Sequence, residues 1–323
     1  MRDTIRFVRG AVSDRALAIP ALSHFCIAKK RIQGANGSVA IDAPIDLEIE
    51  AVVHADRFLA AVDACDGEPK MRFTDGGRLV LERKPFRAML PVLPLAEFPI
   101  SEPSKGKRFK LKGSVIDTLK ILLPFMGDDA AATHRWTSSL LFHEGAAYAT
   151  NSAMMASLPC KTIDQSVELP HHAVDELIRI AETPEEYCFD ETSITFFWKE
   201  GRWLRSQLLV EKWPIKMATE LLKFKIKPAP LPPNLLASIK RIIPFCADPK
   251  FPVIFFKENG VSTAPGEVQA EINDYRLEAS AFHAENLIPM LERIDRMTVE
   301  NGVKAYCLGP NGFRGLMSCL NLK

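Results

Sequence analysis

The sequence predicts an α+β protein made of three similar modules, each with two helices packed on antiparallel sheet. An internal repeat supports this prediction: residues 119–126 read LKILLPFM and residues 239–246 read IKRIIPFC. The spacing of apolar residues supports it too, because helical and alternating stretches follow each other in the same order three times. These patterns predict three copies of one fold rather than three unrelated domains.

Two sets of amphipathic helices are expected, with apolar residues three or four positions apart. The first helix of each module is predicted near 1–12, 114–125 and 233–245. The second helix of each module is predicted near 55–64, 171–181 and 283–295.

Strands are expected between the helices. Apolar side chains alternate with acidic ones over residues 39–53, which predicts strands with one face on a core and one face in water. Tight turns that need positive φ are predicted at Asn36-Gly37, Gly76-Gly77, Asn259-Gly260 and Asn311-Gly312.

Two aromatic-proline pairs mark the predicted module boundaries. The segments LAEFP (95–99) and VEKWP (210–214) are each followed by a basic connector, at 104–112 and 212–227. The predicted modules are therefore 1–99, 100–214 and 215–323. Open sheet edges favour aggregation, so modules of this kind need to be joined edge to edge, and a closed ring leaves no edge at all.

Composition excludes several classes of protein. The 323 residues are 47% hydrophobic and 25% charged, without an apolar run of the roughly 18–20 residues that span a membrane. The first residues, MRDTIRFVRG, lack the apolar stretch of a secretory signal, so a cytoplasmic protein is expected. The seven cysteines form no CxxC pair and are predicted to be reduced, mostly buried thiols.

No catalytic motif is present. The sequence lacks HExxH, GxSxG, a P-loop and a GxGxxG after a strand, and the glycine-rich GPNGFRG (309–315) is interpreted as a hairpin turn. His171 and His172 are predicted to be exposed at a helix start, where neighbouring side chains diverge by about 100° and suit one metal ion poorly. We therefore predict no enzyme activity, no metal and no cofactor.

The net charge of +1 does not by itself indicate nucleic-acid binding, so the placement of the basic residues decides. In the first helix three arginines share one face, opposite the apolar face of Ile5, Val8 and Val12. The basic residues of the three first helices are Arg2, Arg6, Arg9, Lys120, Lys240 and Arg241. Two interpretations are open: a solvated helix face, or a stripe that contacts phosphates without reading sequence.

Five segments resemble a known family, the bacterial DNA polymerase III β subunit, or sliding clamp. They are AVSDRALAIPALSHFCI (11–27), IDAPIDLEIEA (41–51), LVLERKPFRAMLPVLPLAEFP (79–99), RWTSSLLFHEGAAYATNSAMMASLP (135–159) and WLRSQLLVEKWP (203–214). The resemblance is strongest in the first module and weakest in the third, where order and spacing carry it.

This resemblance implies a processivity factor rather than an enzyme. Two subunits form a ring around duplex DNA, helices line the hole, and the ring tethers a polymerase to its template. A clamp loader opens the ring, and partners insert short linear peptides into a groove between modules two and three. The expected location is the cytoplasm, at the nucleoid.

The resemblance also implies positions for the functional residues. The groove residues that match the family are Thr137, Thr150, Ser152, Met154, Met155, Pro214, Thr219, Phe251 and Met317. Where the family has His and Arg in its Thr-Asp-Gly-His-Arg-Leu motif, this chain has Ala153 and Met154, so a diverged peptide preference is expected. On the DNA side, Arg15 matches the family's basic residue after the first helix.

The sequence departs from the family at its start, where the family has a strand and this sequence begins essentially at the first helix. That departure and the divergence suggest a phage or mobile-element version. An alternative remains open: a clamp-fold scaffold or regulator that binds polymerase or loader without encircling DNA. The oligomeric state discriminates between the two.

Overall fold

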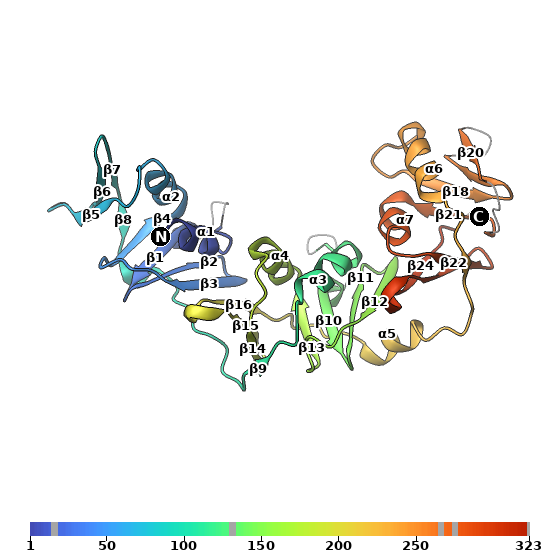
Figure 1. Cartoon of the computed structure of the whole chain (residues 1–323), viewed down its shortest axis with the longest axis horizontal. Helices are drawn as coiled ribbons and strands as arrows, with labels where there is room; N and C mark the ends of the chain where they lie inside the picture. The colour runs from blue at the N-terminus through green and yellow to red at the C-terminus, as the bar shows by residue number, and fades with distance from the viewer. Residues whose placement is uncertain (14–18, 129–133, 264–267, 273–276, 322–323) are drawn as a thin grey trace. The chain divides into compact units, whose positions relative to one another are not determined.

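The computed structural model describes the 323-residue chain except for residues 14–18, 129–133, 264–267, 273–276 and 322–323. The chain divides into two compact units, which are described separately (Figure 1). Unit 1 comprises Met1–Ile116 and His172–Leu208, and unit 2 comprises Asp117–His171 and Leu209–Lys323. Along the chain one order of elements occurs three times: a helix, four strands, a second helix and three strands.

Six helices begin and end close to the predicted positions: α1 (Arg2–Arg9), α2 (Ala55–Asp63), α3 (Ile116–Leu122), α4 (His171–Ile180), α6 (Leu235–Ile242) and α7 (Ala284–Leu291). Another helix, α5 (Ile215–Leu221), was not predicted and lies within the segment expected to be a basic connector. The Pro-Phe repeat has a structural explanation. Leu123–Phe125 and Ile243–Phe245 are 3-10 turns, η3 and η6, that end α3 and α6, because proline has no N–H to continue the helical ladder.

Unit 1 is built on a nine-stranded antiparallel sheet in the order β8-β4-β1-β2-β3-β16-β15-β14-β9. Its strands are β1 (His24–Ala28), β2 (Arg31–Ala35), β3 (Val39–Pro44), β4 (Ala51–His54), β8 (Val92–Leu93), β9 (Phe109–Lys110), β14 (Glu186–Phe189), β15 (Ser193–Phe197) and β16 (Trp203–Gln207). The first and second repeats meet where β3 pairs with β16, with Trp203 opposite Asp42 and Ser206 opposite Val39.

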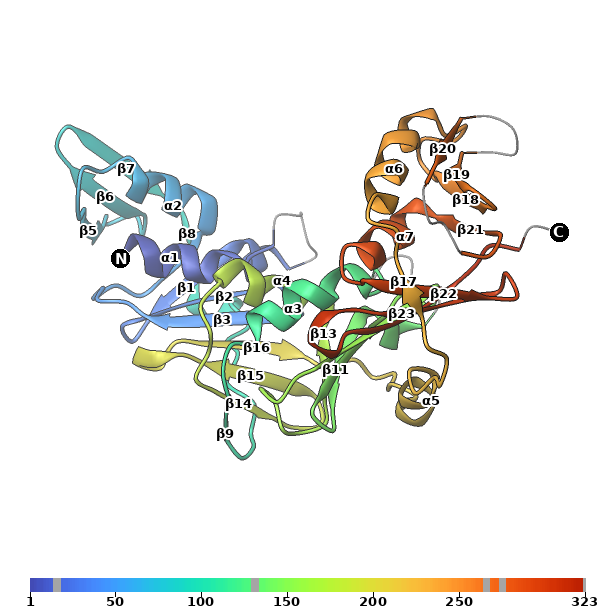
Figure 2. The same cartoon turned by 45° about the vertical axis from the view of Figure 1, so that its right-hand side comes forward.

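One face of this sheet is covered by α1, α2 and α4 (Figure 2). Ile5 and Val8 of α1 are fully buried, and the Phe58 ring of α2 lies edge-on to Phe25 of β1. The His172 ring of α4 lies 3.0 Å from the Ser206 hydroxyl of β16. Side chains alternate along a strand, so Arg205 and Gln207 point to the opposite face.

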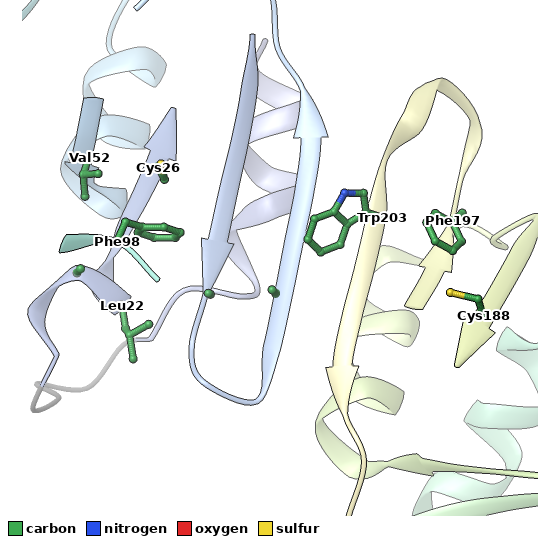
Figure 3. Close-up of a cluster of buried hydrophobic side chains, with 10 residues drawn as sticks. Leu22, Cys26, Val52, Phe98, Cys188, Phe197 and Trp203 are labelled. Atoms are coloured by element: carbon green, nitrogen blue, oxygen red, sulfur yellow. The ribbon is translucent and has the colours of Figure 1, made fainter. Parts of the chain in front are cut away.

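The opposite face carries the connector between the first two repeats. Phe98 packs there with Leu22, Cys26 and Val52, while Trp203 joins a group on the neighbouring strands (Figure 3). The connector is fixed by polar contacts as well: the N–H of residue 101 donates to Gln33 Oε1 at 2.7 Å, and the N–H of residue 104 donates to Thr195 Oγ1 at 2.8 Å.

A separate three-stranded sheet in unit 1 has the order β5-β6-β7. Its strands are β5 (Lys70–Phe73), β6 (Leu79–Arg83) and β7 (Phe86–Leu90). Within the described residues neither outer strand has a further neighbour. The second and third repeats differ, because short strands β9 and β17 pair there with β14 and β22, the counterparts of β5.

Unit 2 contains an eight-stranded sheet in the order β13-β10-β11-β12-β24-β23-β22-β17 and a four-stranded sheet in the order β20-β19-β18-β21. The strands of the larger sheet are β10 (Ser139–His143), β11 (Ala146–Thr150), β12 (Met154–Pro159), β13 (Val167–Pro170), β17 (Ala229–Pro230), β22 (Arg296–Glu300), β23 (Lys304–Leu308) and β24 (Arg314–Ser318). The smaller sheet has β18 (Val253–Lys257), β19 (Gly260–Ser262), β20 (Gln269–Glu271) and β21 (Ser280–His283). The second and third repeats meet where β12 pairs with β24.

Two local predictions were wrong. Residues 39–53 form strands only at their two ends, β3 and β4, because the chain leaves the sheet after Pro44, where the N–H of Ile45 donates to the carbonyl of Lys30 at 2.9 Å. The predicted water-exposed face is also missing from β3, where even Asp42 is buried. His171 and His172 are half-buried rather than exposed, since they start a helix that packs on the sheet. The prediction for the cysteines is confirmed: all seven are free thiols and six are buried.

Candidate functional site

The arginine stripe of α1 lies on its solvent-facing side, as predicted. Arg2 and Arg6 have side chains that are 41% and 58% exposed, whereas Arg9 is 23% exposed. The helix keeps this orientation because Ile5 and Val8 anchor its other face in the core.

Each arginine of the stripe has an acidic or carbonyl partner on α2, which the sequence patterns did not indicate. Asp63 lies 3.8 Å from Arg2 and 3.2 Å from Arg6, and Asp56 lies 2.8 Å from Arg9. Arg2 also donates to the carbonyls of Val62 and Cys65. The stripe is therefore a mixed-charge surface, whose ability to attract phosphates is reduced by its two aspartates.

The corresponding helices carry fewer basic residues. Lys120 on α3 is exposed, and so are Lys240 and Arg241 on α6. The Lys240 ammonium lies 2.7 Å from Glu292, just after α7, which repeats the pairing between the two helices of the first repeat. Arg15, the remaining predicted DNA contact, lies outside the described residues.

The predicted groove residues fall on two sides of the eight-stranded sheet. Met155 lies opposite Leu316 in the ladder, while its neighbour Met154 lies opposite Met317. Because successive side chains of a strand point to opposite faces, the Met155 and Met154 groups cannot form one surface. Both groups are buried, but against different elements.

The first face carries an apolar cluster under α5. Its buried members are Leu141, Met155, Trp213, Ala218 and Leu222, with Trp136, Tyr148, Ile215, Phe224 and Leu316 partly buried around them. Pro214 precedes α5, and the Thr219 hydroxyl is bonded back to the carbonyl of Ile215 at 3.0 Å. We call this set the α5 cluster.

Trp213 is the central side chain of the α5 cluster. Its indole N–H donates to the Ser139 hydroxyl at 2.9 Å, and its ring stands edge-on to Trp136 with centroids 4.9 Å apart. The backbone N–H of Trp213 points to the Glu168 carboxylate at 3.2 Å. Burial raises the pKa of Glu168, against the opposing effects of this N–H and of Lys212.

The second face carries a polar cleft of about 410 Å³ beside η3 and the start of α7. Thr137, Ser152 and Met154 line it together with Asn151 and Asn286. The Asn151 amide donates to the Asn286 side-chain oxygen at 2.8 Å and fixes the β11–β12 turn against α7. The Thr150 hydroxyl donates within the same turn, to the carbonyl of Met154 at 2.7 Å.

Phe251 belongs to neither group; it is 58% exposed just before β18. Sequence reasoning did not single out Trp213 and Leu316, which belong to the α5 cluster. Trp213 was used only to mark a boundary, although its place before the proline matches that of the buried Phe98. Leu316 follows from the period of two along β24, because it is the neighbour of Met317 that faces Met155.

Two further properties of the described residues bear on these surfaces. In the part of the chain that the structure describes, no three His, Cys, Asp or Glu side chains are grouped as metal ligands would be. Among the same residues, no helix combines the length and the apolar character needed to span a bilayer.

Known structures resemble the whole chain. The Pseudomonas aeruginosa DnaN sliding clamp bound to griselimycin aligns with a TM-score of 0.78 over 100% of this chain and 97% of its own, at 16% identity. The β subunit from DNA polymerase of Streptococcus pyogenes gives 0.78 over 99% and 97%, at 15% identity. The Helicobacter pylori β clamp bound to a DNA ligase peptide gives 0.75 over 99% and 97%, at 13% identity.

The chain has the β sliding clamp fold. The resemblance predicted from the sequence is thus confirmed at the level of structure, and the α+β fold class with it. No family model and no curated protein matches the sequence itself. The three repeats of the clamp fold therefore persist here with few identical residues.

Proposed function

We propose that this chain is a subunit of a DNA sliding clamp, a non-enzymatic processivity factor that closes into a ring around duplex DNA. One observation carries the proposal: the two seams between repeats are built from equivalent strands, and the two strands that would build a third seam each lie at the outer edge of their sheet in the described residues. The chain thus repeats one edge-to-edge strand contact twice and leaves the two edges for a third such contact open, one at each end. Subunits of this kind can join head to tail and close into a ring.

The equivalence of the seams follows from strand order. The third strand of one repeat pairs with the last strand of the next, as β3 pairs with β16 and β12 pairs with β24. The remaining third strand is β20 and the remaining last strand is β7, and both are outermost in the described sheets. We propose that β20 of one subunit pairs with β7 of another, and that two such seams close a dimer.

In this ring the duplex contacts the helix-bearing face of the sheets. Arg2, Arg6 and Arg9, with Lys120, Lys240 and Arg241 of the equivalent helices, would contact phosphates. Such contacts position a protein without reading sequence, and they let it slide.

Partner peptides are proposed to bind on the other face, along the α5 cluster. Met217 and Leu221 of α5 are 48% and 36% exposed beside the buried Ala218 and Leu222, which leaves apolar surface for a short linear motif. The Helicobacter pylori clamp of the same fold is bound to a DNA ligase peptide. By analogy a polymerase and a clamp loader would dock here, and the location of this activity would be the cytoplasm, at the nucleoid.

Topological retention tests the proposal. The protein is loaded onto nicked circular plasmid, washed at high salt, and the circle is then cut with a restriction enzyme. A ring stays on the circle and leaves the linear molecule by sliding off its ends. Equal release from both forms would refute encirclement.

One observation favours a second candidate, a clamp-fold scaffold that binds polymerase or loader without encircling DNA: the aspartates of α2 neutralise part of the α1 stripe. The solution mass separates the two. A dimer of about twice 36.0 kDa fits the ring, whereas a strict monomer at micromolar concentration fits the scaffold.

A further inference from the structure

A pocket of about 400 Å³ lies on the connector-bearing face of unit 1. Arg205 of β16 reaches into it from the sheet. The connector forms the rim with Ile100, Pro103 and Lys105. Ile100 is 66% exposed there, so the rim is apolar on one side.

Arg205 is unusual among the partly buried cations of this chain. Its Nε is shielded from solvent and has no hydrogen-bond partner, and no ion pair of Arg205 occurs anywhere in the described residues. Arg202, three residues earlier, also has an unpaired buried Nε, but both of its terminal nitrogens bind the Glu182 carboxylate, at 3.0 and 2.6 Å. An unsatisfied buried donor on a charged group is costly, which makes Arg205 ready to bind an oxyanion.

The acidic neighbours do not serve as its partner. Asp190 lines the same pocket, but its carboxylate accepts hydrogen bonds from Thr192, Ser193 and the backbone N–H of Lys105. Glu102 also lines the pocket, and it forms no ion pair with Arg205. Neither acidic residue of the lining is therefore paired with Arg205.

The pocket is built into the sheet rather than formed by surface side chains. Arg205 lies between Ala40 on β3 and Thr195 on β15. The small side chain at position 40 leaves room above the strand. The Thr195 hydroxyl holds residue 104 of the connector, at 2.8 Å from its backbone N–H.

We propose that this pocket binds a carboxylate of a partner protein, an Asp or Glu side chain flanked by apolar residues, and is a second docking site at the seam between the first two repeats. The choice of a protein carboxylate over a nucleic-acid phosphate rests on the proposed function. Ser206 faces α4 and Arg205 therefore faces away from the helices. A duplex on the helix-bearing face cannot reach it.

Arginine side-chain NMR of the full-length chain tests the site without DNA or loader, so it can fail while encirclement holds. The Nε–Hε signal of Arg205 is identified as the one lost in Arg205→Gln. The probes are acetyl-Leu-Asp-Leu-amide, acetyl-Leu-Asn-Leu-amide and inorganic phosphate at matched ionic strength. We expect a saturable shift of this signal with the Asp peptide only. The variants lack the signal, so their affinity for the Asp peptide is measured from the backbone amide signal of Lys105, which lines the pocket. That affinity should fall at least about tenfold in Arg205→Gln and less in Arg205→Lys, which keeps the charge but not the planar guanidinium.

Three results would overturn the proposal. A shift with phosphate but not with the Asp peptide would exclude a protein carboxylate as ligand. No shift with any probe at tens of millimolar would mean that the guanidinium is merely hydrated. A Tm for Arg205→Gln well below wild type would show that Arg205 has a structural partner, because removal of an unpaired charge leaves stability unchanged or raises it.

Discussion

The arginine stripe of α1 permits a quantitative test of DNA contact. The variant Arg2→Ala, Arg6→Ala, Arg9→Ala removes all three arginines. Arg2 and Arg6 are the more exposed two, so their loss should remove the contacts that phosphate can reach most easily. In a ring of two subunits, Arg2 and Arg6 together supply about four phosphate contacts. Each contact contributes about 0.9 to the slope of the logarithm of the DNA-binding constant against the logarithm of the salt concentration. The slope on duplex DNA should therefore become shallower by about 3 to 4.

The folded state should survive this change. Exposed ion pairs contribute about 0–1 kcal/mol each, so losing the three pairs to Asp63 and Asp56 costs at most about 3 kcal/mol of unfolding free energy. Fluorescence anisotropy on short duplexes across a salt series measures the slope, and thermal melting checks the fold. The matched variant Asp56→Asn, Asp63→Asn should have the opposite effect on DNA affinity. It neutralises the carboxylates that compete with phosphate for the arginines, so DNA binding should become tighter.

The outcome that contradicts this reasoning is specific. If neither variant changes the salt slope while both remain folded, the stripe is a solvated ion-paired face and DNA contact lies elsewhere. A change in the arginine variant alone would still support contact, but would show that the α2 aspartates do not compete with phosphate.

Four further predictions follow from single sites. Met89→Glu places a charge on the free β7 edge, where Met89 is 45% exposed, and should weaken the dimer at least about tenfold by sedimentation; an unchanged dimer would place the seam elsewhere. Trp213→Ala should cost about 3–5 kcal/mol in urea unfolding, because it leaves a large cavity in the α5 cluster; a loss below 1 kcal/mol would show that the cluster collapses freely. Leu221→Glu should abolish binding of a polymerase-derived peptide with little change in Tm, and unaltered binding would remove α5 from the groove. Burial opposes ionisation of Asp190, but hydrogen bonds, chiefly from Thr192, lower its pKa from 3.8 to about 2. The ionised carboxylate therefore stabilises the folded state above pH 4, and this stabilisation is lost as the pH falls toward 2. The unfolding free energy of Asp190→Asn, measured across an acid titration, should lack this loss.

The sequence predicted the helices well because their ends are chemically marked. The Pro-Phe pairs end α3 and α6, and the apolar spacing of Ile5 and Val8 determines which face of α1 is buried. The alternation over 39–53 was less informative, since Pro44 ends β3 and the acidic positions that follow lie outside the sheet. Local signals thus located elements better than they located the gaps between strands.

The candidate sites depended on contacts that are distant in sequence. Nothing near Arg6 indicates that Asp63, on the next helix, will pair with it. The adjacent Met154 and Met155 were both assigned to the groove, although a period of two requires them to face opposite sides once β12 is a strand. Arg205 was not singled out at all, because an arginine without a partner can be recognised only when all its neighbours are known.

The two seams also show why one fold presents different outer surfaces at equivalent places. At the first seam, the connector after Phe98 contains Pro99 and Pro103, which disfavour a helix, and it lies flat on the sheet through hydrogen bonds to Gln33 and Thr195. At the second seam, the connector after Trp213 has no proline between residues 215 and 227, and it forms α5 over an apolar cluster. The first arrangement leaves a small polar pocket above Arg205, and the second leaves an apolar surface along a helix. Proline spacing after an aromatic-proline pair therefore accounts for the difference in partner chemistry that we propose for the two seams.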